Sequence, residues 1–101
     1  MATPRMPLGA TADQIRSWAM ELLVDEMLAT YVDWRQAAWA VGEAYGHWSD
    51  ASAPERSVRH AAYIAALDRE ESAALGYAAA VADVALAIAD DVGADTSETP
   101  R

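Results

Sequence analysis

Residues 20–48 read MELLVDEMLATYVDWRQAAWAVGEAYGHW, and this stretch decides the fold. Its apolar residues recur at steps that alternate between four and three, which is the a/d spacing of a heptad repeat kept over four heptads. The row consists of Met20, Val24, Met27, Tyr31, Trp34, Ala38, Val41, Tyr45 and Trp48. Such a row predicts one long helix whose aromatic-rich stripe must be covered by another helix.

Capping and turn residues mark the ends of this first helix. Thr11 and Gln14 form a T-x-x-Q capping box directly before the apolar pattern begins. Near the other end, Gly42 and Gly46 weaken the last turns by roughly 1 kcal/mol each relative to alanine. We therefore expect a helix over about residues 12–48, preceded by a flexible N-terminal arm over residues 1–10 and followed by a turn.

A second helix is predicted directly after this turn. Ser52 and Glu55 have the spacing of an S-x-x-E capping box, and Pro54 is tolerated in a first helical turn. Gly93 is a natural stop. The second helix is therefore expected over about residues 53–92, which gives a hairpin domain over residues 11–93 and a flexible tail over residues 94–101.

Two helices of nearly equal length joined by a short turn form an antiparallel hairpin. With the turn centred near residue 50, residue i should face roughly residue 101 − i, which places Trp34 opposite Leu67 and Val24 opposite Tyr77. The second helix has a seam of its own, formed by His60, Tyr63, Leu67, Glu70, Ala74, Tyr77, Val81, Val84 and Ile88. The expected fold is all-α, a long antiparallel two-helix hairpin.

Apolar residues outside the seam predict self-association. The first helix carries a second apolar set, namely Trp18, Leu22, Ala29, Val32 and Trp39. Residues 73–89 are apolar on nearly every side, and a helix of that kind is normally covered by several neighbours. We expect two hairpins to dimerise into a four-helix bundle. The expected interface residues are Trp18, Val32, Trp39, Tyr77, Val84 and Ile88.

Composition narrows the class of protein. The net charge of −9 disfavours nucleic acid and anionic membranes as partners, and the absence of cysteine rules out a disulfide framework and thiolate chemistry. Arginine replaces lysine throughout and alanine is abundant, which is typical of a GC-rich genome such as that of an actinobacterium or its phage. Residues 1–10 lack the continuous apolar segment of a signal peptide, so we expect a cytoplasmic protein.

Four carboxylates are candidate metal ligands, because Glu70 and Glu71 lie nearly level with Asp25 and Glu26 in the expected hairpin. Ferritin-like di-metal sites add a Glu-x-x-His motif, which is missing here because alanine stands three residues after each of Glu70 and Glu71. We therefore expect no metal and no cofactor, and predict that Glu70 is satisfied by Tyr31 or Arg35 and fixes helix register.

No catalytic arrangement is found in the sequence. It contains no Ser/His/Asp grouping and no glycine-rich phosphate loop after a strand, so an enzyme is not expected. His60 lies on the seam, where a lone histidine is usually a satisfied or boundary residue. The tryptophans and tyrosines at heptad spacing are typical of core and interface rather than of a ligand pocket.

The whole-chain architecture resembles the small W-x-G hairpin proteins that type VII secretion exports. That family carries W-x-G in the turn and Y-x-x-x-D/E after the second helix. In this chain the turn reads Trp48-Ser49-Asp50, and Tyr77 is followed four residues later by Val81. The resemblance implies a helical partner and secretion without a cleavable signal peptide.

Together these observations predict a non-enzymatic small acidic helical protein that self-associates and binds another protein. The first alternative is an exported hairpin like those of type VII secretion, with a helical partner. The second alternative is a ferritin-like carboxylate metal protein built on Glu70, Glu71, Asp25 and Glu26.

Overall fold

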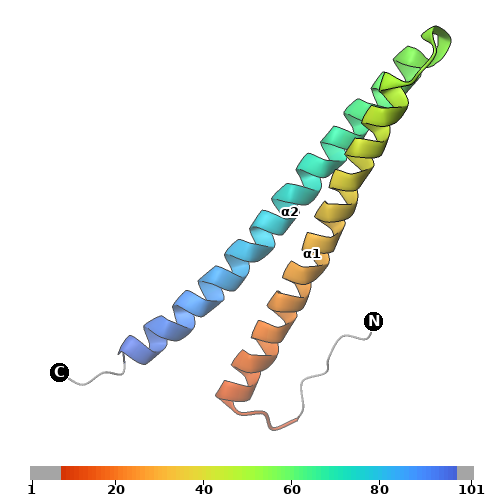
Figure 1. The fold of residues 1–101 in the computed structure, drawn as a ribbon. Coiled ribbons are helices and arrows are strands. Elements are labelled where there is room, and N and C mark those ends of the chain that lie inside the picture. The colour runs from red at the N-terminus through yellow and green to blue at the C-terminus, as the bar shows by residue number, and fades with distance from the viewer. Residues whose placement is uncertain (1–7, 98–101) are drawn as a thin grey trace.

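The computed structural model describes residues 8–97, with side chains described through residue 93, and it contains two long antiparallel helices (Figure 1). Helix α1 spans Ala12–Ser49, the short 3-10 helix η1 spans Ala53–Glu55, and α2 spans Arg56–Ser97. No strand occurs among these described residues. The prediction of an all-α hairpin is therefore confirmed.

The N-terminus of α1 is capped as the sequence predicts. The Gln14 N–H donates to Thr11 Oγ1 at 3.2 Å, and the Thr11 N–H donates to Gln14 Oε1 at 2.8 Å. This reciprocal pair satisfies two of the backbone donors that a helix start leaves open. Gly9 precedes the cap with a positive φ of 74°, a conformation that favours glycine. Residues 1–7 of the expected arm lie outside the described residues.

The start of the second helix differs from the expectation. Ser52 has the extended backbone of an N-cap, but its side chain makes no capping hydrogen bond, so the predicted S-x-x-E box does not form. The Glu55 N–H donates instead to the backbone carbonyl of Ser52 at 3.0 Å, which builds the 3-10 turn around Pro54. As a result, the α-helical part begins at Arg56, a few residues later than expected.

The predicted stop at Gly93 is wrong, because α2 continues through this glycine to Ser97. Gly93 does not adopt the positive φ of a glycine cap. A glycine within a helix costs only about 1 kcal/mol relative to alanine, which does not by itself end a helix. Residues 94–97 of the expected tail are therefore helical, and residues 98–101 lie outside the described part of the chain.

The pairing register of the two helices is shifted from the expected one. Tyr31 lies against Tyr77 with ring centroids 5.4 Å apart, and Tyr45 lies against Tyr63 at 5.6 Å. These pairs differ by about one heptad from the facing rule, because the loop and η1 move the centre of the turn towards the C-terminus. A shift by a whole heptad keeps the same faces in contact, so the two seams still meet although their partners change.

The second half of the α2 seam is rotated relative to the prediction. Val81 and Ile88 are exposed, whereas Ala80 is buried. A straight α-helix drifts by about 20° per heptad against an ideal 3.5-residue repeat, so a strict heptad row turns away from its partner along the helix. The two helices also diverge towards the N-terminal end of α1 (Figure 1).

The hairpin has almost no core of its own. Only Ala66 and Ala80 are buried among the described side chains, and no large side chain is fully buried. The radius of gyration is 21.1 Å, against about 13 Å for a globular domain of a hundred residues. Each helix therefore retains long solvent-facing sides, and these sides are where a function of this chain must be sought.

Candidate interaction surface

The contact between the two helices is organised around Trp34. Its indole N–H donates to Glu70 Oε2 at 2.7 Å, and its ring stacks on Tyr77 with centroids 5.6 Å apart. The predicted partners of Glu70 were Tyr31 and Arg35, and this prediction is corrected by the register shift. Tyr31 packs edge-on against Trp34, and the Arg35 guanidinium lies 5.9 Å from the Trp34 ring centroid.

A second aromatic cluster lies next to the turn. Trp48 stacks on Tyr63 with centroids 5.4 Å apart and contacts the His60 ring at 4.7 Å. His60 is thus a packing residue at the edge of the hairpin. Both clusters use the aromatic side chains of the heptad row as contacts between α1 and α2, as the sequence predicts.

The four candidate metal ligands are not brought together. In the observed register Glu70 and Glu71 are level with about residues 38 and 37 of α1, so Asp25 and Glu26 lie more than ten residues away, roughly 17–20 Å along the helix. Over the described residues, no three His, Cys, Asp or Glu side chains form a group that could hold a metal ion. The expectation that they lie at one level is therefore wrong.

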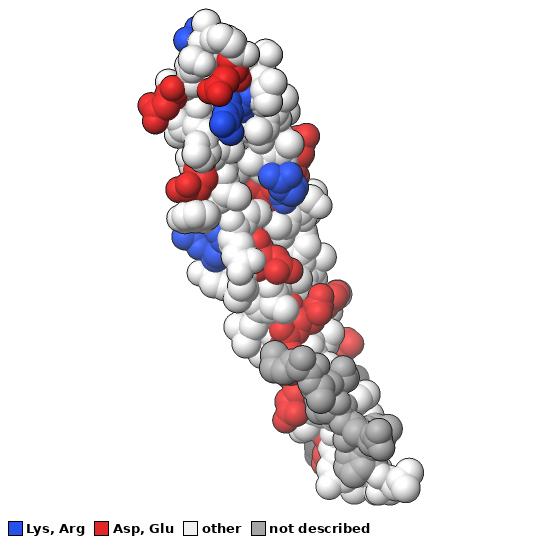
Figure 2. All heavy atoms as spheres, turned by 90° about the vertical axis from the view of Figure 1, so that its right-hand side faces the viewer, with Lys and Arg blue, Asp and Glu red and all other residues white. Residues whose placement is uncertain are grey.

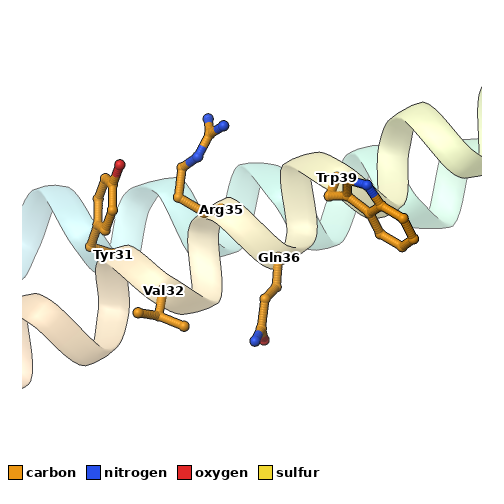
Figure 3. Close-up of a pocket in the computed structure, with 5 residues that line it drawn as sticks. All are labelled: Tyr31, Val32, Arg35, Gln36 and Trp39. Carbon is orange, nitrogen blue, oxygen red and sulfur yellow. The ribbon is translucent and has the colours of Figure 1, made fainter.

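A shallow, largely apolar groove lies on the side of α1 that α2 leaves open. It has a volume of about 310 Å³ and is lined by Tyr31, Val32, Arg35, Gln36 and Trp39 (Figure 3). Trp39 is 70% exposed and Val32 is 50% exposed. An indole this exposed on a folded helix is unusual and is typical of binding surfaces, where tryptophan is enriched.

The remaining expected interface residues fall on different faces. Trp18 and Val84 are half-buried, and Ile88 is exposed. Tyr77 belongs to the contact between α1 and α2, so it serves the hairpin itself. Leu28, Leu75 and Leu86 are also exposed and were not among the predicted interface residues. Leu28 lies four residues before Val32, a helical spacing that places the two side chains on one face of α1.

A wider cleft of about 870 Å³ opens where the helices diverge. Met20 and Leu23 from α1 and Ala87 from α2 contribute its apolar lining. Arg16 bridges this end, forming an ion pair with Asp13 and lying 3.8 Å from Asp91. Both ion pairs are exposed, and exposed pairs contribute roughly 0–1 kcal/mol, so this end of the hairpin is weakly held.

Charged side chains are scattered over the surface. Figure 2 shows acidic residues along the length of one face with single arginines between them. This face has no continuous basic patch of the kind that tracks a phosphate backbone.

Within α2, an 18-residue window is long and apolar enough to cross a membrane by length and composition alone, with a mean hydropathy of 1.7.

The chain matches no family model, no curated protein and no solved structure. The function must therefore be inferred from the surfaces of the molecule itself. Three features bear on the function: a core of only two buried alanines among the described side chains, the exposed groove beside Trp39 on α1, and exposed apolar residues on α2.

Proposed function

We propose that this chain is a non-enzymatic, cytoplasmic interaction protein whose hairpins associate into a four-helix dimer, and that the dimer binds another protein. The observation that carries the proposal is the burial pattern. Only two alanines are buried among the described side chains, while large apolar residues remain exposed on both helices. Helices gain most of their stability from packing an apolar face, and one hairpin covers only part of these faces.

The exposed apolar residues favour an oligomer over a monomer. The exposed leucine, isoleucine, valine and tryptophan residues on the helices are Ile15, Leu28, Val32, Trp39, Val58, Ile64, Leu75, Val81, Leu86, Ile88 and Val92. Monomeric proteins rarely leave contiguous apolar patches of more than a few hundred Å² open to water. The non-enzymatic role rests on the sequence, which contains no nucleophile–base arrangement and no phosphate-binding loop.

Molar mass and helicity measured together test this proposal. Sedimentation equilibrium should give the mass of a dimer at tens of micromolar, with circular dichroism showing a helical protein. Trp39→Glu should shift the protein towards monomer, because an unpaired charge in a dry interface is costly. Ser57→Glu is the control, because Ser57 is an exposed polar residue at the start of α2. A monomer with full helicity at this concentration would overturn the proposal.

A further inference from the structure

A second heptad row runs along α1 on the side that carries the Trp39 groove. Its steps alternate between three and four, as in the main seam, but it includes charged residues and glycines as well as apolar ones. We call it the outer row; it consists of Trp18, Glu21, Asp25, Leu28, Val32, Arg35, Trp39, Gly42 and Gly46. From Glu21 to Gly42 every member of the row is exposed, so α2 does not cover this part.

The outer row is complementary to itself when two copies of α1 lie antiparallel. In antiparallel coiled coils the a positions of one helix pack against the d positions of the other. With a two-fold axis near residue 30, Leu28 meets Val32 of the second copy, and Asp25 meets Arg35 of the second copy. Because a two-fold contact is isologous, each of these pairs occurs twice.

The outer pairs match in chemistry and in size. Glu21 meets Trp39 of the second copy, which repeats the indole–carboxylate pairing that joins Trp34 to Glu70 within the hairpin at 2.7 Å. Trp18 lies at the level of Gly42 of the second copy, where a large ring faces a residue without a side chain. A Cβ added to Gly42 would meet nothing within 4 Å in the single chain, so packing within the hairpin gives no reason for glycine there.

Other arrangements of the same row leave its charges unpaired. A parallel pairing sets Asp25 against Asp25 and Arg35 against Arg35, and like charges across an interface disfavour a complex. A shift by one heptad in either direction places Asp25 opposite Gly42 or Leu28, which leaves a carboxylate without a partner against an apolar or empty position. Among the described residues of the single chain, Arg35 forms no ion pair, so its guanidinium is available to the second copy.

We propose that the outer row of α1 is the self-association surface of this protein, and that its occupant is the outer row of a second copy, antiparallel about a two-fold axis near residue 30. The inference rests on the proposed self-association and assigns its surface, orientation and register. In this arrangement the Trp39 groove is filled by the second α1. The outer row lies one residue, or about 100°, around α1 from the seam that contacts α2, so α2 of each copy lies beside this contact.

Charge reversal tests the register directly. Asp25→Arg alone places arginine against Arg35 of the second copy, and Arg35→Asp alone places aspartate against Asp25. Each variant should raise the dissociation constant at least about tenfold, because the unfavourable pair occurs twice. An equimolar mixture of the two variants should recover the wild-type affinity as a heterodimer, because every arginine then faces an aspartate. Asp33→Arg, exposed on α1 outside the row, is the control with the same charge change as Asp25→Arg.

Cross-linking provides a readout with the native charges retained. The chain has no cysteine, so Leu28→Cys mixed with Val32→Cys should form a disulfide between the two variants faster than either variant does alone. Asp33→Cys should cross-link slowly. A dimer that ignores the charge reversals, or that cross-links equally well through Asp33→Cys, would overturn the assigned surface and leave the proposed function standing. A monomeric wild-type protein would overturn the proposed function instead.

Discussion

At the scale of single residues, Trp34 connects the helices most closely, because it combines a hydrogen bond to Glu70 with stacking on Tyr77. Trp34→Ala should destabilise the hairpin by about 2–4 kcal/mol, through lost ring contacts and an unpaired Glu70 carboxylate. Urea unfolding followed by circular dichroism at one fixed protein concentration measures this loss. Val58→Ala, at an exposed position, is the control. A loss below about 1 kcal/mol would mean that the Trp34 contacts contribute little.

The Glu70→Gln substitution distinguishes a structural role of Glu70 from a metal-binding role. Glu70→Gln keeps an oxygen that can accept the Trp34 indole N–H, so we expect a change in unfolding free energy of no more than about 1 kcal/mol. Elemental analysis of the purified protein should find no stoichiometric iron, manganese or zinc, before or after the substitution. A near-integer metal content that Glu70→Gln removes would contradict this prediction and the non-enzymatic proposal with it.

At the scale of helices, alanine substitutions of the glycines in α1 distinguish effects on helix stability from effects on association. A Cβ at Gly42 or Gly46 would meet nothing within 4 Å, so Gly42→Ala and Gly46→Ala should each stabilise the helix by about 0.5–1 kcal/mol. If the outer row pairs as proposed, Gly42→Ala should also weaken dimerisation, because its methyl group meets Trp18 of the second copy. Thermal melts and dissociation constants of both variants measure the two effects. Equal association of the two variants would argue against the proposed register.

The helical elements could be predicted from the sequence because their signals are local. Thr11 and Gln14 form the predicted cap, and the apolar spacing gives α1 to within one residue at its end. The register could not be fixed, since every heptad of a seam resembles the next and only the length of the turn distinguishes them. For the same reason the predicted partners of Glu70 were Tyr31 and Arg35, whereas the observed partner is Trp34. The outer row could not be predicted from apolar spacing, because the charged residues Asp25 and Arg35 interrupt it.

At the scale of the whole molecule, the described hairpin is thin: the chain measures 73 × 34 × 13 Å, and its thinnest dimension is close to the diameter of one helix. Every described residue therefore lies near solvent on at least one side, and the proposed association would cover part of these exposed faces. Association that stabilises only the folded state makes the midpoint of thermal unfolding, Tm, dependent on protein concentration.

We therefore expect Tm to rise by several degrees over a hundredfold increase in protein concentration. For a dimer that unfolds to separate chains, each tenfold increase adds about 1.4 kcal/mol of stability per dimer. Circular dichroism melts in cells of different path length measure this shift. The Asp25→Arg variant is the internal comparison, because weakening the contact between copies should flatten the dependence while leaving the α1–α2 contacts intact. A Tm that is independent of concentration in the wild-type protein, together with a monomer mass, would mean that one hairpin is stable without any cover for its apolar faces.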